Sequence, residues 1–274
     1  MTSGAEAREL RDEAVVIARA AGDILKARLN LERSVSAKDT SGVDLVTDAD
    51  RASEDAILEA LGRRFPDHAV LAEERGEVGK GTFLWLVDPL DGTVNYTHRV
   101  PHFCVSMAVE GPGPSGARQL LAGVVVNPML GEVFAAAAGQ GATLNGAPIR
   151  VSAAKGLSSA LVCTGFPYSL RESPEAPLAL FNRLVPRAQG VRRLGAAALD
   201  LAYLAAGRFD AFFEYGLKPW DTAAGALLIQ EAGGVIARLD GGPYDARSPD
   251  IVAATPLVAP ELMAECAAFV AARS

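Results

Sequence analysis

An apolar run that stops abruptly at an acid restricts the fold more than any other feature of this chain. It lies in residues 83–93, which read FLWLVDPLDGT. The run is short, rich in aromatic residues and bounded by Gly81 and Pro89, which is typical of a strand buried on both faces. Pro89 fixes its own φ and lacks an N–H, so we expect the strand to end at Asp88 and the chain to turn there, with Asp91 three residues later.

The residues that follow Asp91 indicate an anion site. Gly92 lets the backbone approach a ligand closely, and if Gly92 and Thr93 open a short helix, their N–H groups converge on one point. Two carboxylates beside a bound phosphate would repel it unless a divalent cation lay between them. The stretch therefore predicts either a metal and phosphate site or a turn in which Asp88 and Asp91 cap the local backbone.

The size and charge of the chain limit its possible partners. With 274 residues, half of them hydrophobic, the chain can bury a large core in one or two domains. The formal net charge of −7 implies no basic face, so we expect no nucleic-acid partner. An acidic protein that binds phosphate needs metal ions to reverse the local field.

The cysteines and the N-terminal segment indicate the compartment. Cys104, Cys163 and Cys266 are scattered through apolar stretches without metal-binding spacing or an even number for pairing, which is typical of buried free thiols in a reducing compartment. Residues 1–22 are rich in Glu, Arg and Asp, unlike a signal peptide, and no segment stays apolar for long enough to span a membrane. We therefore expect a cytoplasmic protein with no membrane partner.

Two helices are predicted at the start of the chain. Apolar residues at helical spacing indicate an amphipathic helix over residues 6–29. A short extended piece at residues 43–46 precedes a second helix that runs from Thr47 to about Arg64. Thr47 and Asp50 have the spacing of a capping box, and capping alone would account for Asp50.

A series of strands follows the two helices. Residues 70–72 form a brief apolar strand that leads to Glu73 and Glu74, and the Gly-rich residues 76–81 are expected to form a mobile loop. Beyond the opening stretch, strands are predicted over residues 105–109, 119–126, 132–138 and 149–151, with a turn at Asn145 and Gly146. Two helices followed by mostly antiparallel strands favour an α+β fold over repeated βαβ units.

A change of composition marks a soft boundary near residue 155. We expect an N-terminal α+β half over residues 1–155, which carries the metal and phosphate motifs, and a C-terminal α/β half over residues 156–274, which completes the site within one compact unit. In the second half, strands are predicted over residues 161–163, 191–194, 209–215, 235–239 and 251–254. Helices are predicted over residues 174–187, from 195 to about 207, 220–231 and 256–272.

Four acids stand at the ends of predicted elements: Glu73, Asp88, Asp91 and Asp221. Carboxylates without Cys or His favour a hard, oxygen-seeking cation, first Mg²⁺ and then Mn²⁺ or Ca²⁺. One carboxylate that bridges two cations would support two-metal hydrolysis, in which one ion deprotonates water and the other stabilises the leaving oxygen. Asp221 taken alone is better explained as a helix N-cap, where Asp is favoured.

Together these segments resemble the inositol monophosphatase family. The matching motifs occur in the family's order, and the two longest are highly specific. They are DLVTDAD at residues 44–50, the pair Glu73-Glu74, DPLDGTVNY at residues 88–96, GATLNG at residues 141–146, WDTAAG at residues 220–225 and EAGG at residues 231–234. The resemblance spans about residues 8–270, nearly the whole chain.

The resemblance implies a fold and an activity. The fold would be a layered αβαβα sandwich of the sugar-phosphatase type, α+β in class, with a mostly antiparallel first sheet. The activity would be Mg²⁺-dependent, lithium-sensitive hydrolysis of a phosphate monoester, usually in a homodimer. The implied substrate is inositol 1-phosphate or a close sugar phosphate.

The resemblance also implies oxygen ligands for two to three Mg²⁺ ions. Glu73, Asp88 and the Leu90 carbonyl would hold the first ion. Asp88, Asp91 and Asp221 would hold the second, so that Asp88 bridges the two. A third, weaker ion would lie near Glu73.

Catalysis and phosphate binding are assigned on the same basis. Thr93, hydrogen-bonded toward Asp50, would help Glu73 to activate the attacking water. The N–H groups of Gly92 and Thr93 would hold the phosphate. Lys38 would lie behind the metal ligands, although its spacing from the DLVTDAD motif is one residue longer than is usual in the family.

On the substrate side, the resemblance implies that Glu214 and Asp91 accept sugar hydroxyls. A loop that contains Gly195 and Ala197 would close over the ring. Ala196 departs from the family, in which Ser or Thr is common at this position, so a hydroxyl that could contact the sugar is missing.

Several alternatives stay open. Within the same superfamily the substrate could be histidinol phosphate, fructose 1,6-bisphosphate or a nucleotide 3′-phosphate, although residues 195–201 and 207–210 resemble the inositol group more closely. A non-catalytic binding or regulatory protein that keeps the fold is a different class. The remaining polar candidates are interpreted as a solvated pair (Arg192, Arg193), a core thiol (Cys163) and structural or surface imidazoles (His68, His98, His102).

Overall fold

The computed structural model describes residues 4–31, 35–38, 45–113 and 117–272. Within these ranges the α-helices are, in chain order, α1 (Gly4–Arg28), α2 (Asp48–Arg64), α3 (Thr93–Thr97), α4 (Glu175–Leu184), α5 (Ala197–Ala205), α6 (Pro219–Glu231) and α7 (Ala259–Ala271). Short 3₁₀ helices occupy Leu157–Ser159, Tyr168–Arg171 and Val185–Arg187. No helix of the described ranges is both long and apolar enough to cross a membrane.

The described strands form three sheets. A small antiparallel pair joins β1 (Val35–Ala37) to β2 (Leu45–Thr47). An eight-stranded sheet has the order β10-β9-β8-β7-β6-β5-β3-β4, and its strands are β3 (Ala69–Ala72), β4 (Gly76–Val78), β5 (Leu84–Asp91), β6 (Cys104–Pro112), β7 (Arg118–Asn127), β8 (Glu132–Ala137), β9 (Ala142–Leu144) and β10 (Ala147–Ile149). Only β3 and β5 pair in parallel there.

The third sheet belongs to the second half of the chain. Its order is β12-β11-β13-β15-β14, with strands β11 (Leu161–Thr164), β12 (Gly190–Arg192), β13 (Ala211–Tyr215), β14 (Val235–Ala237) and β15 (Asp250–Ala254). In this sheet β11 is parallel to both β12 and β13, and β15 is antiparallel to both of its neighbours.

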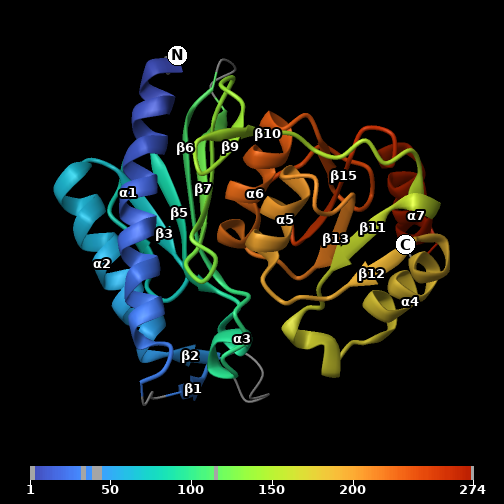
Figure 1. The fold of residues 1–274 in the computed structure, drawn as a ribbon, viewed down its shortest axis with the longest axis horizontal. Coiled ribbons are helices and arrows are strands. Elements are labelled where there is room, and N and C mark those ends of the chain that lie inside the picture. Colours follow the sequence, from blue (N-terminus) through green and yellow to red (C-terminus); the bar gives the residue numbers. More distant parts are fainter. Residues whose placement is uncertain (1–3, 32–34, 39–44, 114–116, 273–274) are drawn as a thin grey trace.

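Helices and sheets alternate in five layers. Figure 1 shows α1 and α2 on one face of the eight-stranded sheet, α5 and α6 between the two large sheets, and α4 and α7 beyond the five-stranded sheet. Three hydrophobic clusters fill the spaces between these layers. The predicted αβαβα sandwich with a mostly antiparallel first large sheet is confirmed.

Strand β5 shows why the apolar run stands at the centre of this architecture. Trp85 and Val87 pack in the cluster beneath α1 and α2, whereas Leu86 packs in the cluster around α5 and α6. All three side chains have no exposed surface. Because successive side chains of a strand point to opposite faces, an uninterrupted apolar run lets β5 lie between two helical layers.

Two local predictions are confirmed in atomic detail. Thr47 is the N-cap of α2: its Oγ1 accepts from the Ala49 N–H at 3.1 Å, and its own N–H donates to Asp50 Oδ2 at 2.9 Å, which completes the capping box. Asn145 and Gly146, with φ of 50° and 81°, make the turn between β9 and β10.

Two other predictions are wrong in part. Strand β5 does not end at Asp88 but continues to Asp91, and its register against β6 shifts between these residues. A bulge accommodates Pro89 without ending the strand, since the missing N–H falls where pairing is already interrupted. Within the predicted loop at residues 76–81, Gly76–Val78 pairs with β3 as β4. Part of the extended piece predicted before Thr47, residues 43–44, lies outside the described residues.

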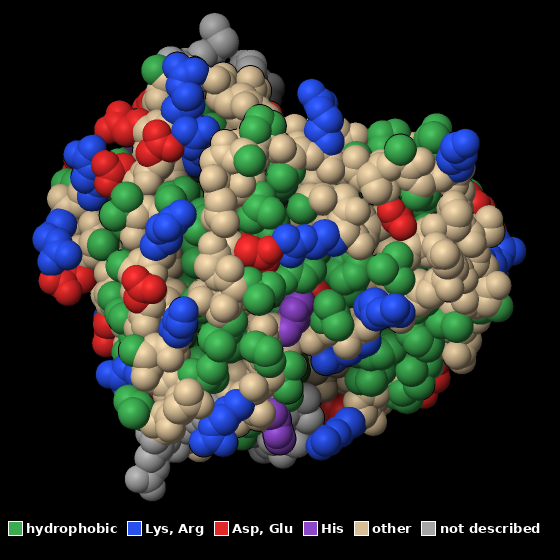
Figure 2. All heavy atoms as spheres, in the orientation of Figure 1, with side chains coloured by type: hydrophobic (Ala, Val, Ile, Leu, Met, Phe, Trp, Pro, Cys, Tyr) green, Lys and Arg blue, Asp and Glu red, His purple; other side chains and the backbone are tan. Residues whose placement is uncertain are grey.

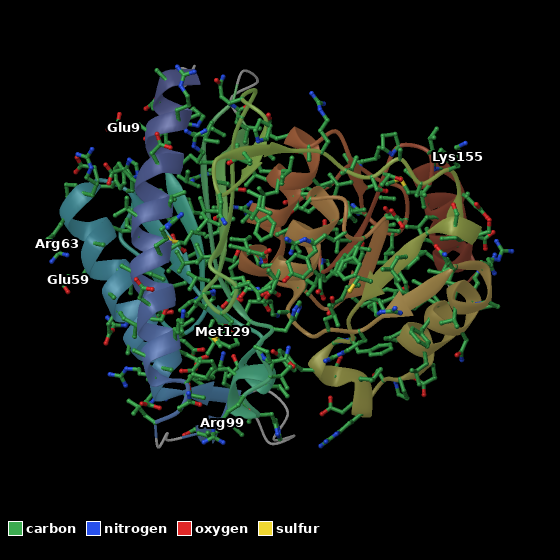
Figure 3. The ribbon with its side chains drawn as sticks, in the orientation of Figure 1. Glu9, Glu59, Arg63, Arg99, Met129 and Lys155 are labelled. Carbon is green, nitrogen blue, oxygen red and sulfur yellow. The ribbon has the colours of Figure 1, made fainter. Side chains whose placement is uncertain are left out.

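The outer surface of α1 and α2 carries mixed charges. Figure 2 shows Asp, Glu, Lys and Arg side chains interspersed over these helices. Glu59 and Arg63 form an ion pair one helical turn apart, and Figure 3 shows both pointing away from the core. Such exposed pairs contribute little to stability, which therefore rests on the buried layers.

The contact between α5 and α6 requires a glycine. A Cβ at Gly225 would lie 2.4 Å from Leu201 Cβ, so Gly225→Ala should lower the free energy of unfolding by about 1–3 kcal/mol through overpacking. The matched control is Gly62→Ala in α2, where a Cβ meets nothing within 4 Å and the change should stabilise by about 0.5–1 kcal/mol. Urea unfolding of both variants checks this, and equal effects would contradict it.

Candidate active site

One pocket collects nearly all the residues singled out in the sequence. It lies at the ends of β3, β5 and β13 and at the first turns of α5 and α6. The predicted residues in its lining are Lys38, Glu73, Asp88, Leu90, Asp91, Gly92, Thr93, Gly195, Ala197, Glu214 and Asp221. Asp50 does not line the pocket but contacts Thr93 from behind it.

The end of β5 presents its acids through local hydrogen bonds. Asp88 Oδ1 accepts from the Leu90 N–H at 2.9 Å. Asp91 Oδ2 accepts from the N–H of Ala198, in the first turn of α5, at 2.8 Å. Gly92 then starts α3 with a φ of 90°, and a Cβ on it would approach the backbone oxygens of Gly195 and His102 at 3.3 and 3.1 Å. This turn therefore requires glycine.

Glu73 reaches the same place because β3 runs parallel to β5. The Glu73 N–H donates to the Val87 carbonyl at 3.1 Å, which sets Glu73 beside Asp88. Lys38 Nζ lies 2.6 Å from Glu73 Oε1 and 2.5 Å from Glu74 Oε1. Burial opposes the charge of Lys38, but the two glutamates raise its pKa overall.

Thr93 connects the pocket to α2. Its Oγ1 lies 3.1 Å from both Asp50 Oδ1 and the Leu90 carbonyl, so the hydroxyl can donate to either acceptor. Asp50 is fully buried, and burial raises its pKa to about 6 in spite of the hydrogen bonds from Thr47. The arrangement holds Thr93 in one orientation and leaves an oxygen lone pair to face the pocket.

The remaining acid of the cluster arrives on α6. Asp221 is not the N-cap of α6, as the sequence taken alone predicted, because Lys218 has that position and Asp221 is the third residue of the helix. Asp221 Oδ2 accepts from the Lys218 N–H at 2.7 Å and so still caps the helix end, while the same residue lines the pocket. Burial raises its pKa well above the ordinary value, and the charges of Glu73 and Asp91 raise it further. The capping role and the position in the pocket are thus compatible, because one carboxylate oxygen can cap while the other faces the pocket.

The chemistry of the donor set fits a hard divalent cation. Burial, followed by the charges of Glu73, Asp91 and Asp221, raises the pKa of Asp88 well above its ordinary value. Burial also raises the pKa of Asp91, to about 6. Buried carboxylates that repel one another in this way are the ligands that Mg²⁺ prefers. As the side chains stand, no group of three or more His, Cys, Asp or Glu among the described residues is arranged to hold an ion, and Lys38 partly neutralises the acids.

The other wall of the pocket faces the five-stranded sheet. Glu214, at the end of β13, packs so closely on Gly165 that a Cβ there would lie 2.0 Å from Glu214 Oε1. Burial raises the pKa of Glu214 well above its ordinary value, and the charge of Asp200 adds to this. Gly195, Ala196 and Ala197 all line the pocket, and Ala196 is almost fully buried in the pocket wall.

Sequence reasoning missed two polar residues of this wall. Asp200 lines the pocket in the first turn of α5 and pairs with His102, although His102 had been interpreted as a structural or surface group. Arg193 also lines the pocket, whereas Arg192 does not. Asp200 could have been found in the sequence, because a single acid in the apolar helix after Gly195 indicates a buried carboxyl with a specific role.

The buried acids predict how stability depends on pH in the absence of metal. The pKa of Asp50 is raised to about 6 and that of Glu74 to about 7, so between about pH 4 and pH 7 the folded state binds more protons than the unfolded state. Stability must then fall as the pH rises through this window. Burial lowers the pKa of His68, so this one group makes stability rise with pH. The several acids with raised pKa values outweigh it.

We therefore expect a higher Tm at pH 5 than at pH 7.5 in EDTA. Adding Mg²⁺ should raise the Tm at pH 7.5 more than at pH 5, because a cation bound to the folded acids offsets their repulsion. Differential scanning calorimetry measures all four values. A metal-free Tm that rises from pH 5 to pH 7.5 would contradict the electrostatic description of the pocket.

Comparison with known proteins agrees with the geometry. The inositol monophosphatase family matches residues 6–272. The chain is 45% identical over 230 residues to Nus factor SuhB of Pseudomonas aeruginosa, covering 82% of this chain and 83% of that protein. It is 39% identical over 250 residues to the chloroplastic phosphatase IMPL1 of Arabidopsis thaliana, covering 90% of this chain and 67% of that protein.

The solved structures show the same relationship. The structure of inositol monophosphatase from Anabaena (Nostoc) superimposes with a TM-score of 0.84 at 40% identity, covering 94% of this chain and 95% of that one. This chain belongs to the inositol monophosphatase family and has the fold of a solved inositol monophosphatase.

Proposed function

We propose that this protein hydrolyses inositol 1-phosphate to inositol and phosphate in a Mg²⁺-dependent reaction. The observation that carries the proposal is the meeting of four acids from β5, α6 and the residue after β3 in one pocket beside the start of α3. These acids are Glu73, Asp88, Asp91 and Asp221. The oxygen atoms of these acids suit Mg²⁺, and the neighbouring N–H groups of Gly92 and Thr93 suit a phosphate bound to that metal.

The proposed ligands divide between two ions. Glu73, Asp88 and the Leu90 carbonyl would hold one, and Asp88, Asp91 and Asp221 the other, with a third, weaker ion near Glu73. Bound Mg²⁺ would lower the pKa of a coordinated water and stabilise negative charge on the leaving oxygen.

The protein's own groups would orient the reactants. The Thr93 hydroxyl, which lies 3.1 Å from Asp50 Oδ1, would accept a hydrogen bond from the attacking water and so orient it, and Glu73 would take up the proton of the water. The N–H groups of Gly92 and Thr93 would hold the phosphate, while Lys38 balances the charge of Glu73. In the outer part of the pocket, sugar hydroxyls would be accepted by Asp91 and Glu214 and covered by the loop at Gly195 and Ala197.

A phosphate-release panel tests the substrate. It compares inositol 1-phosphate with histidinol phosphate, fructose 1,6-bisphosphate and a nucleotide 3′-phosphate, each with Mg²⁺ and with EDTA. The highest kcat/KM is expected for inositol 1-phosphate. A higher value for another member would reassign the substrate, and Mg²⁺ binding without turnover of any member would favour a binding or regulatory protein.

The same proposal includes the properties that usually accompany this activity. We infer inhibition by Li⁺, a homodimer, a cytoplasmic location and no nucleic-acid partner. The last is supported by the net charge of −7 and the mixed charges over α1 and α2 (Figure 2). Several relatives are named Nus factor SuhB, and that name describes those relatives only. Light scattering for the dimer and the release assay with added Li⁺ check the first two inferences.

A further inference from the structure

A largely buried hydrogen bond between His102 and Asp200 joins two segments that are 98 residues apart. His102 Nε2 lies 3.0 Å from Asp200 Oδ1, and the side chains are 14% and 2% exposed. Asp200 stands in the first turn of α5, and His102 lies between α3 and β6. An almost fully buried carboxyl group requires hydrogen-bond partners, because a buried polar group without one is destabilising.

The segments that this pair joins form the outer wall of the pocket. Ala198, two residues before Asp200, donates its N–H to Asp91 Oδ2 at 2.8 Å. Asn95 in α3 donates to both the His102 and the Leu194 carbonyl at 2.8 Å, so the loop before α5 is tied to the same place. The start of α5, the loop before it and the chain around His102 are thus one connected unit.

The phosphate turn rests on this unit. A Cβ built on Gly92 would meet Ala196 Cβ and the His102 carbonyl at 3.1 Å and the Gly195 carbonyl at 3.3 Å. A shift of α5 would therefore weaken the hydrogen bond from Ala198 to Asp91 and change the shape of the loop, while Asp91 itself stays anchored in β5. It would not directly move Glu73, which follows β3, or Asp50 on α2.

We propose that His102 and Asp200 are a positioning pair that fixes the start of α5 against Asp91 and Gly92 and thereby sets the affinity for the alcohol half of the substrate. This rests on the proposed phosphatase function. The pair acts through Ala198 and the Leu194–Gly195 loop. Its loss should raise KM and leave kcat nearly unchanged, since the groups that act on the water stay in place.

The test compares three variants with the wild type on inositol 1-phosphate and Mg²⁺. His102→Leu removes the hydrogen bond between His102 and Asp200 and should raise KM about tenfold or more, with kcat within about threefold. His102→Gln keeps a donor near the position of Nε2 and should bring KM back to within about threefold of wild type. The matched control is His98→Leu, an exposed imidazole four residues earlier, which should change neither constant.

Partial unfolding cannot imitate the expected result, because it lowers the concentration of active enzyme and therefore kcat, not KM. If His102→Leu does not fold, the double variant His102→Leu/Asp200→Leu removes the buried charge as well and should show the same rise in KM. A KM for the folded variant within about twofold of wild type would overturn the proposal, and so would a His102→Gln variant no better than His102→Leu.

Hydrogen exchange separates this proposal from the proposed function. Amides of residues 197–205 should exchange about tenfold faster in His102→Leu than in wild type and His98→Leu, because the tether of α5 is lost. If the wild type hydrolyses no phosphate ester, the proposed function fails. The exchange rates still show whether His102 and Asp200 hold α5 in place. Unchanged exchange over residues 197–205 would overturn the positioning role.

Discussion

Replacing Asp88 with asparagine is expected to lower kcat for phosphate release by about 10³-fold. The charges of Glu73, Asp91 and Asp221 all raise the pKa of Asp88, after burial, so Asp88 interacts with each of the other three acids. If it bridges two cations, its loss removes about 4 kcal/mol of transition-state stabilisation. Phosphate release at saturating Mg²⁺ measures the effect.

The same substitution should raise the Tm of the metal-free protein. Asparagine has nearly the same shape but carries no charge, so it relieves repulsion among buried acids. The control is Asp12→Asn, whose side chain is 65% exposed and far from the cluster in the sequence. A variant that is inactive because it is unfolded would show a lower Tm, and full activity of Asp88→Asn would contradict the metal assignment.

Replacing Thr93 with valine is expected to lower kcat by about 10²–10⁴-fold. Valine keeps the shape of the side chain and the backbone N–H but removes the hydroxyl that donates to Asp50, so only the positioning and deprotonation of water are lost. Affinity for Mg²⁺, measured by calorimetric titration, should change little because Thr93 is not a proposed ligand.

Thr97 supplies the matched control for this prediction. It lies in the same short helix, and its Oγ1 donates to the Val94 carbonyl at 2.8 Å. Thr97→Val should keep kcat within about twofold of wild type. Equal losses in the two variants would mean that the hydroxyl of Thr93 supports only the helix.

The part of the candidate site that is formed by residues adjacent in the sequence could be predicted. Asp88 and Asp91 are among the last residues of β5, which is buried on both faces, and Gly92 follows it. Acids and a glycine at the end of a buried strand indicate a binding site without further information. That Glu73 meets Asp88 depends on the parallel pairing of β3 with β5, which lies beyond the reach of local patterns. The order of the motifs and the family resemblance supplied that part of the prediction.

The pairing of His102 with Asp200 could not be predicted. An imidazole in a turn is compatible with a surface, core or paired role, and the two residues meet only after both large sheets have formed. The continuation of β5 past Pro89 was missed for a related reason. Proline usually interrupts a strand, and only the neighbouring strand β6 shows that the interruption is a shift of register.

The most direct measurement is phosphate release from inositol 1-phosphate by the wild type and Asp91→Asn, each with Mg²⁺ and with EDTA. Asp91 contributes both to the proposed second metal site and to the substrate wall, where it accepts the Ala198 N–H. We predict that the wild type releases phosphate with Mg²⁺. Release should be lost in EDTA and in the Asp91→Asn variant. Undiminished release in EDTA or by Asp91→Asn would contradict a metal-dependent phosphatase site at the end of β5.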